Sequence, residues 1–131
     1  MNPQPQAPGE TRRAASAWQV GGQPAHFDPL LECLVELTRI HGVPWTRESL
    51  VAGLPLENNL LTPSLLPRAA ARAGLSARVV RRRIAELPGR LLPAILLLKD
   101  RRALLLLERL EDGQVRVRFP ESGERSEERR V

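Results

Sequence analysis

The spacing of apolar residues changes once along this chain, at Gly74, and that change limits the fold more than any other feature. Between Asp28 and Gly74, apolar residues recur at intervals of three and four in several segments, as on one face of an α-helix. After Gly74, they alternate with polar residues or form short continuous runs, which is typical of β-strands. Helices followed by strands, rather than alternating with them, predict an α+β domain with an antiparallel sheet.

A first helix is predicted over residues 29–41. Asp28 is a favoured N-cap, and Pro29 suits the first helical position because that position needs no N–H donor. Gly42 follows the last apolar residue and is a typical helix stop. The sequence therefore marks both ends of this helix.

Two further helices are predicted in the first half of the chain. Thr46 can cap a short helix over residues 47–52. Thr62 and Pro63 repeat the signal of a cap followed by proline. They predict a third helix that runs to Ala73.

The second half of the chain has the pattern of an antiparallel meander. Two of its apolar runs are continuous, which is typical of central strands covered on both faces. The dipeptide Asp112-Gly113 predicts a tight hairpin before the last strand. The predicted strands are 77–82, 94–98, 103–107 and 115–119.

The chain of 131 residues suits one domain, with boundaries set by composition. Residues 1–26 are rich in Pro, Gln, Gly and Ala without periodicity, and we expect a disordered lead-in there. The domain is expected to span 27–123, followed by a charged, aperiodic tail over 124–131. Apolar runs are shorter than the roughly 20 residues of a membrane span, and the N-terminus does not have the pattern of a secretion signal, which predicts a cytoplasmic location.

The net charge of +5 comes mostly from arginine, and it raises the question of anionic partners. The basic residues are scattered and aromatic residues are few, so a small nucleic-acid-binding or regulatory module is only an alternative. Two histidines and one cysteine do not cluster, and there is no glycine-rich phosphate loop. We therefore predict no metal and no cofactor.

Cys33, the only cysteine, is the one obvious candidate nucleophile. It lies on the apolar face of the first predicted helix, where a buried thiol has a high pKa. His41 lies eight residues later, about 12 Å away along the helix, which is too far to activate it. His26 falls in the lead-in. The residues alone thus provide no nucleophile–base pair.

The order of several segments resembles the double-glycine leader peptidases, the papain-like cysteine peptidase domains at the N-terminus of bacterial ABC exporters. The resemblance covers about residues 28–123 and implies N-terminal helices packed on an antiparallel sheet. It also implies that the chain stops before one further helix–strand element of that fold. The segments that carry the resemblance are Asp28 to Gly42, Leu61 to Leu75, Ser76 to Arg82, Leu92 to Leu96 and Val115 to Pro120.

Residue by residue, the resemblance implies that the catalytic triad is missing. The position of the catalytic Cys is taken by Pro29, that of the His by Arg102 and that of the Asp by Phe119. Cys33 then matches a second, non-catalytic small position. Gln23 stands at about the spacing of the oxyanion-hole Gln. Proline has no nucleophile and arginine is no base near neutral pH, so catalysis is not expected.

This combination resembles the degenerate peptidase-like domains of type I secretion exporters for RTX toxins and adhesins, which hold unfolded substrate near the transporter. It implies a non-catalytic domain at the inner face of the bacterial inner membrane. Its partners would be an unfolded secreted polypeptide and the transmembrane and nucleotide-binding parts of an ABC exporter. Arg101, Arg102 and Phe119 are the expected substrate-binding residues. The alternative within the family is an active cysteine peptidase that uses Cys33 to cleave double-glycine leader peptides.

Overall fold

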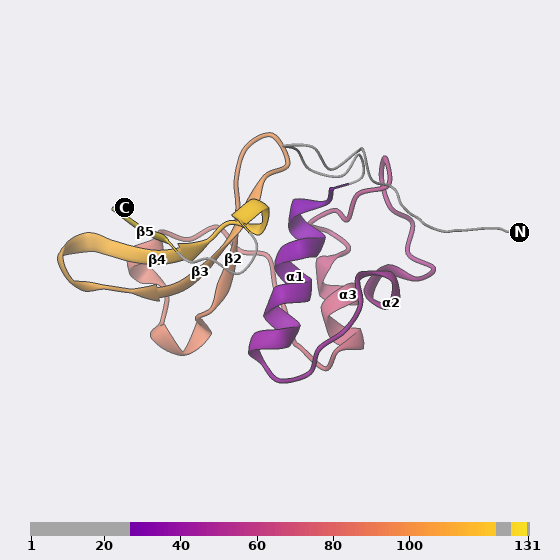
Figure 1. Ribbon diagram of the computed structural model, residues 1–131, viewed down its shortest axis with the longest axis horizontal. Helices are drawn as coiled ribbons and strands as arrows, with labels where there is room; N and C mark the ends of the chain where they lie inside the picture. Colours follow the sequence, from indigo (N-terminus) through magenta and orange to yellow (C-terminus); the bar gives the residue numbers. More distant parts are fainter. Residues whose placement is uncertain (1–26, 123–126, 131) are drawn as a thin grey trace, which may run out of the picture.

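The computed structural model describes residues 27–122 and 127–130, in which three helices form one half and a four-stranded antiparallel sheet forms the other (Figure 1). This arrangement confirms the predicted α+β class. Short 3-10 turns lie between these elements at Ile84–Glu86 (η2), Gly89–Leu91 (η3), Glu111–Gly113 (η4) and Pro120–Ser122 (η5). The helices are α1 (Pro29–Ile40), α2 (Arg47–Val51) and α3 (Leu66–Arg72), and the strands are β2 (Ala94–Leu97), β3 (Ala103–Arg109), β4 (Gln114–Arg118) and β5 (Glu127–Arg130).

The helix α1 begins and ends where its caps predict. The carboxylate of Asp28 accepts a hydrogen bond from the backbone N–H of Leu31 at 3.2 Å, and Pro29 occupies the first turn. His41 is the C-cap, and Gly42 follows at φ +76°, a left-handed conformation that glycine adopts without steric cost. The prediction for this helix is confirmed to within one residue.

The helix α3 starts later than its sequence signal, and the predicted cap at Thr62 and Pro63 is wrong. The Thr62 hydroxyl lies 3.1 Å from the Ser64 hydroxyl and not against a backbone amide. Residues 63–65 form a turn in which the N–H of Leu65 donates to the carbonyl of Thr62 at 3.0 Å. Pro67 then falls in the first turn of the helix, where its missing N–H costs little.

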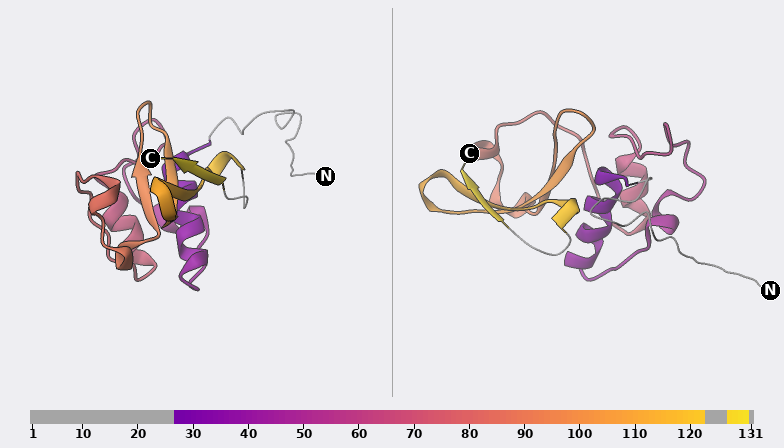
Figure 2. Two further views of the ribbon diagram at one scale, coloured as in Figure 1. Left: turned by 90° about the vertical axis from the view of Figure 1, so that its left-hand side faces the viewer. Right: turned by 45° about the horizontal axis from the view of Figure 1, so that its top comes forward.

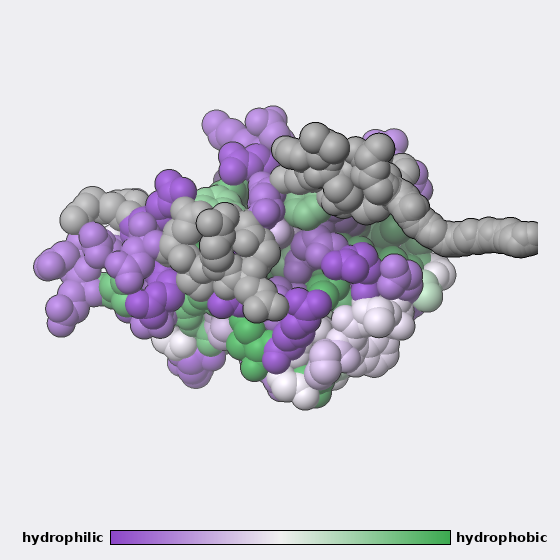
Figure 3. Space-filling view, viewed as in Figure 1, coloured by the Kyte–Doolittle hydropathy of each residue, from purple (hydrophilic) through white to green (hydrophobic). Residues whose placement is uncertain are grey.

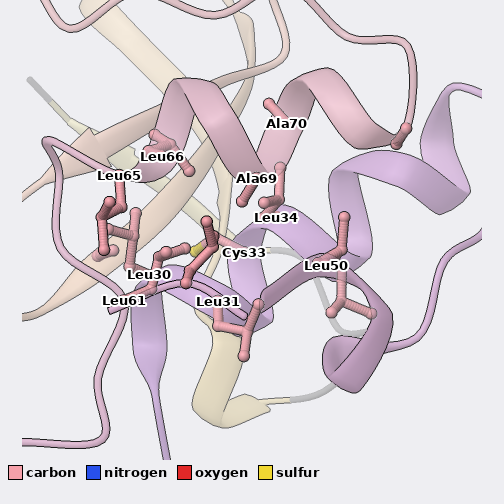
Figure 4. Close-up of a cluster of buried hydrophobic side chains, with 14 of the residues drawn as sticks. Leu30, Leu31, Cys33, Leu34, Leu50, Leu61, Leu65, Leu66, Ala69 and Ala70 are labelled. Atoms are coloured by element: carbon pink, nitrogen blue, oxygen red, sulfur yellow. The ribbon is translucent and has the colours of Figure 1, made fainter. Parts of the chain in front are cut away.

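The main hydrophobic core lies around α1, which lies between the sheet and the other two helices (Figures 1 and 2). Leu34 and Leu50 are almost fully buried, and each such side chain contributes about 2 kcal/mol by its removal from water. Figure 4 shows how these side chains from α1, α2 and α3 point toward one another. The cluster consists of Leu30, Leu31, Cys33, Leu34, Val35, Leu50, Leu54, Leu61, Leu65, Leu66, Ala69, Ala70, Ala73, Ala103 and Leu105.

The strand β3 is buried on both faces, as its continuous apolar run predicts. Leu105 faces the helical core, while Leu104 and Leu106 enter a second cluster with Val115 and Val117 of β4. The same expectation is wrong for β2, which pairs only with β3 in the described sheet and is partly exposed. A continuous apolar run therefore marks the central strand in one case and an edge strand in the other.

Residues 77–82 do not form the predicted strand. They contain no turn, bend or helix and pair with no strand in the described part of the chain. Figures 1 and 2 show an open trace that leaves the end of α3. The alternating pattern of this segment is present, but a strand also needs a neighbour for its backbone hydrogen bonds.

The strand β5 lies within the stretch 124–131, for which the sequence predicts a charged, aperiodic tail and no strand. The residues of β5 pair antiparallel with β4, with Arg116 opposite Glu128. The Arg116 guanidinium donates to the Glu128 carboxylate at 3.1 Å and also binds Glu108 of β3. Opposite charges across neighbouring strands can stabilise a solvated edge without apolar residues.

One face of the molecule carries mostly polar side chains over the strands. On the face seen in Figure 3, hydrophilic residues gather over the strands at the left, and the hydrophobic areas are small and separate. Within the described ranges, no helix is long and apolar enough to cross a bilayer.

Candidate functional site

A groove of about 550 Å³ lies where the helical half meets the sheet. Three segments form its walls: the start of α1, the stretch 55–65 between α2 and α3, and the turn between β2 and β3 at 97–102. Pro29 contributes from the first wall, and Arg101 and Arg102 from the third. The groove thus joins parts of the chain that are far apart in sequence.

Asp28 fixes two of these walls to each other. One carboxylate oxygen caps α1, and the other accepts a hydrogen bond from the backbone N–H of Leu61 at 2.7 Å. The residue is only 5% exposed, and burial raises the pKa of the Asp28 carboxyl above its ordinary value of 3.8. The hydrogen bonds from Leu61 and Leu31 act in the opposite direction, and nearby Glu32 raises it further.

An ion pair between Glu57 and Arg101 bridges the second and third walls. Glu57 begins a tight turn in which its own N–H donates to the carbonyl of Leu60 at 3.0 Å, with Asn58 and Asn59 at positive φ. Arg101 lies in the β2–β3 turn and is itself at φ +60°. The two turns face each other across the groove through this pair of charges.

The structure brings together two of the three positions that the sequence matches to a catalytic triad. Pro29 and Arg102 both line the groove, and Arg101 lies beside them. Phe119 is not among the lining residues. It packs against the second hydrophobic cluster, and the Arg129 guanidinium lies 5.3 Å from the centre of its ring. Phe119 is therefore in a position to support the sheet, whereas Arg101 and Arg102 face the groove.

The fold is similar to a solved structure, the N-terminal peptidase C39-like domain of the toxin secretion ATP-binding protein from Vibrio parahaemolyticus. The two chains are 39% identical, the TM-score is 0.75, and the match covers 79% of this chain and 84% of the other. This chain belongs to the peptidase C39-like domains. The resemblance and the papain-like α+β fold predicted from the order of motifs are thereby confirmed. No family model and no curated protein matches the sequence.

The only thiol of this C39-like domain lies in its core, away from solvent. Cys33 is 1% exposed, among leucines of α1 and its neighbours (Figure 4). Burial raises the pKa of the Cys33 thiol to about 12, and the negative charges of Glu121, Glu32 and Asp28 add to this effect. His41 is an exposed cap at the far end of the same helix.

The remaining candidate residues are two that lie outside the described ranges and any that could bind a metal. His26 and Gln23 lie outside the described residues. Within the part of the C39-like domain that is described, no group of three or more His, Cys, Asp or Glu side chains could hold a metal ion. The sequence did not indicate two features of the groove: the ion pair of Glu57 with Arg101, and the hydrogen bond from Leu61 to Asp28. These contacts join residues that are 44 and 33 positions apart in the chain, so no local pattern marks them.

Proposed function

We propose that this C39-like domain does not cleave peptides and instead holds an unfolded secreted polypeptide for a type I secretion exporter. The observation that supports the proposal is the lining of the groove, which includes both Pro29 and Arg102, the residues that the sequence matches to the nucleophile and the base. Proline has no side-chain nucleophile. An arginine guanidinium is always protonated and cannot accept a proton at neutral pH.

Cys33 does not replace the missing nucleophile. With a pKa of about 12, roughly one thiol in 100,000 is ionised at neutral pH. The side chain is also closed off from any substrate by the core leucines. A peptidase that used Cys33 would have to open its hydrophobic core first.

The groove has instead the character of a binding site for extended chain. Leu97 and Leu98, at 42% and 37% exposure, offer apolar contacts beside the guanidinium groups of Arg101 and Arg102. Apolar surface next to fixed positive charge favours segments that combine apolar and acidic residues. RTX substrates of type I secretion are typically acidic, which fits this preference.

The relationship to the Vibrio protein, which is named as a toxin secretion ATP-binding protein, supports the proposed transporter partners. We infer that this domain acts beside the transmembrane and nucleotide-binding parts of an ABC exporter, at the cytoplasmic face of the bacterial inner membrane. No cofactor is needed for this role.

The test measures the affinity of the full chain for a fluorescent, unfolded acidic polypeptide at low salt. Arg102→Glu should weaken binding about tenfold, because one attraction between opposite charges becomes a repulsion between like charges. Arg90→Glu, an exposed position in η3, makes the same charge change away from the groove and should leave the affinity unchanged. Equal affinity of Arg102→Glu and the unaltered chain at low salt would show the proposal to be wrong.

A second experiment separates the rival functions. The chain is incubated with a double-glycine leader peptide and a thiol-alkylating probe, and fast, selective labelling of Cys33 together with cleavage would revive the peptidase. Binding of duplex DNA with a steep salt dependence would favour a nucleic-acid-binding module instead. We expect neither, because the thiol is buried and the described aromatic residues do not line the groove.

A further inference from the structure

The stretch from Ser76 to Arg83, called here the basic segment, has an open backbone. It contains no turn, bend or helix, and none of its residues has a positive φ. Arg83, where the backbone angles are φ −75° and ψ 146°, is extended. These features describe a chain that runs on without reversing, as a strand does.

The backbone of the basic segment lacks hydrogen-bond partners within the protein. From Ser76 to Arg82, no N–H or carbonyl group bonds to another described residue. A segment of alternating sequence with its backbone groups unpaired has the properties of an exposed sheet edge.

Both ends of the basic segment are nevertheless anchored. At its start, Leu75 and Ala77 pack against the helical core. Just after its end, the Arg109 guanidinium of β3 donates to the carbonyls of Ile84 and Ala85 at 3.0 Å. The middle is thus held in place between two fixed points, which lowers the entropy lost when a partner binds.

The exposed side chains of the basic segment define what could bind there. Val79 and Val80 are each 50% exposed, and β-branched residues of this kind favour strand conformation. Among the described residues, none forms an ion pair with any of the four arginines, which are Arg78, Arg81, Arg82 and Arg83. If side chains alternate as in a strand, each face offers one valine and two arginines.

We propose that the basic segment is a docking edge for an acidic, extended strand of a partner protein. The partner's backbone pairs with the free N–H and carbonyl groups, and its acidic side chains lie opposite the arginines. The segment carries no aromatic residue on which a base could stack, so the charges favour an acidic polypeptide over nucleic acid. This inference does not rest on the proposed function, because the groove takes no residue from the basic segment.

The experiment uses the full chain and a synthetic peptide of alternating glutamate and valine, and it follows amide hydrogen exchange. Peptide should slow the exchange of amides within residues 77–83 about tenfold, because pairing protects them. The same peptide with N-methyl groups on alternate residues should give no protection. If the methylated peptide binds equally well, attraction between charges alone accounts for binding and strand docking is wrong.

Matched variants separate this edge from the groove. Arg81→Glu together with Arg82→Glu should weaken peptide binding about tenfold, since two attractions become two repulsions. Arg68→Glu with Arg90→Glu makes the same charge change at other exposed positions and should have no effect. The readout is the protection of residues 77–83 and not total binding, so any binding of the same peptide in the groove, which Arg102→Glu should weaken, is seen separately.

Three results would overturn the inference. Protection confined to the groove residues 55–65 and 97–102 would assign the peptide to the groove. Tighter binding of duplex DNA than of peptide at the same salt concentration would assign the basic segment to nucleic acid. Self-association that protects residues 77–83 in the absence of peptide would make a second copy of this chain the occupant.

Discussion

The two turns at either end of β3 have similar backbones and different residues. Before β3, Asp100 and Arg101 have φ angles of +61° and +60°. After β3, Asp112 and Gly113 have φ angles of +61° and +74°. Two consecutive residues at positive φ are what the tightest hairpin connections require, and Asp-Gly is a favoured pair for them. Arginine in the same place is not.

The difference shows which turn is shaped by its backbone and which by its side chain. Glycine adopts a left-handed conformation without steric cost, whereas a residue with a Cβ loses about 1 kcal/mol there. Arg101 lines the groove and pairs with Glu57, while Gly113 lies at the other end of the strand. Local strain retained beside a groove favours a role for that side chain in binding.

The largest effect is expected at the wall that Arg101 faces, where the Asp28 carboxylate joins that wall to α1 through its hydrogen bond from the N–H of Leu61. Asp28→Ala removes the helix cap and leaves the buried N–H of Leu61 without its acceptor. It should lower the free energy of unfolding by about 2 kcal/mol, measured by urea denaturation. Asp28→Asn keeps the cap but offers no second carboxylate oxygen, and should cost about half as much.

The pH dependence of stability in the unaltered chain and in Asp28→Asn tests whether burial of the Asp28 carboxyl causes the effect. Because the pKa of Asp28 is raised in the folded protein, protonation favours the folded state. That contribution is complete below the ordinary value of 3.8 and is lost as pH rises through the raised pKa. The stability advantage of the unaltered chain over Asp28→Asn should therefore shrink from about pH 4 to neutral pH. An advantage that grows with pH would contradict this assignment.

The next largest effect is expected for Gly113, in the turn after β3. A Cβ at Gly113 meets no atom within 4 Å, so Gly113→Arg changes only the conformational cost at φ +74°. It should lower the free energy of unfolding by about 1 kcal/mol, measured by urea denaturation. Gly89→Arg is the matched control, because that position is equally open but its φ is not positive. Equal effects of the two substitutions would mean that turn conformation is not what separates them.

These turns also show what could be predicted from the sequence. Signals carried by adjacent residues were sufficient for α1 and for the hairpin at Asp112-Gly113, because caps and turns act locally. They failed for residues 77–82 and for β5, since pairing depends on neighbours far along the chain. The motif order placed Pro29 and Arg102 in one site.

The lining of the groove follows from the sequence only in part. Arg101 and Arg102 were predicted to bind substrate, and both line the groove, but the left-handed backbone of Arg101 carries no local signal. Phe119 was grouped with them, although its ring packs on the second cluster. Its apolar side chain in an alternating strand was a sign of that packing role.

A smaller effect of opposite sign is expected on the arginine side. Arg101→Gly relieves the left-handed strain, and this gain should exceed the loss of an exposed ion pair and the added freedom of the unfolded chain, so the unfolding free energy should rise by about 0.5 kcal/mol. Arg102→Gly, at a neighbouring position without positive φ, should instead lower it, because glycine adds freedom to the unfolded chain. Thermal denaturation of the two variants decides the point. A loss of stability in Arg101→Gly would show that the side chain offsets its strain within the fold, with no need of a ligand.

The smallest change in stability is expected for a substitution of Glu57. The same substitution tests most directly whether Arg101 binds substrate in the groove. The Glu57 carboxylate forms an ion pair with the Arg101 guanidinium, to which an acidic side chain of the proposed substrate would bind. Glu57→Gln removes one exposed ion pair and should alter the unfolding free energy by less than about 0.5 kcal/mol. Because it frees Arg101, it should raise the affinity for an unfolded acidic polypeptide about threefold at low salt.

The control for this prediction is Glu111→Gln, which makes the same charge change at the β3–β4 turn, outside the groove. A general gain in positive charge would raise the affinity in both variants, whereas release of Arg101 raises it only in Glu57→Gln. The double change Glu57→Gln with Arg101→Gly should remove the gain, since no guanidinium remains to be released. If the gain in affinity persists in the double variant, Arg101 does not contribute to binding of the polypeptide. Binding would then not explain why the turn before β3 has arginine at positive φ where the turn after β3 has glycine.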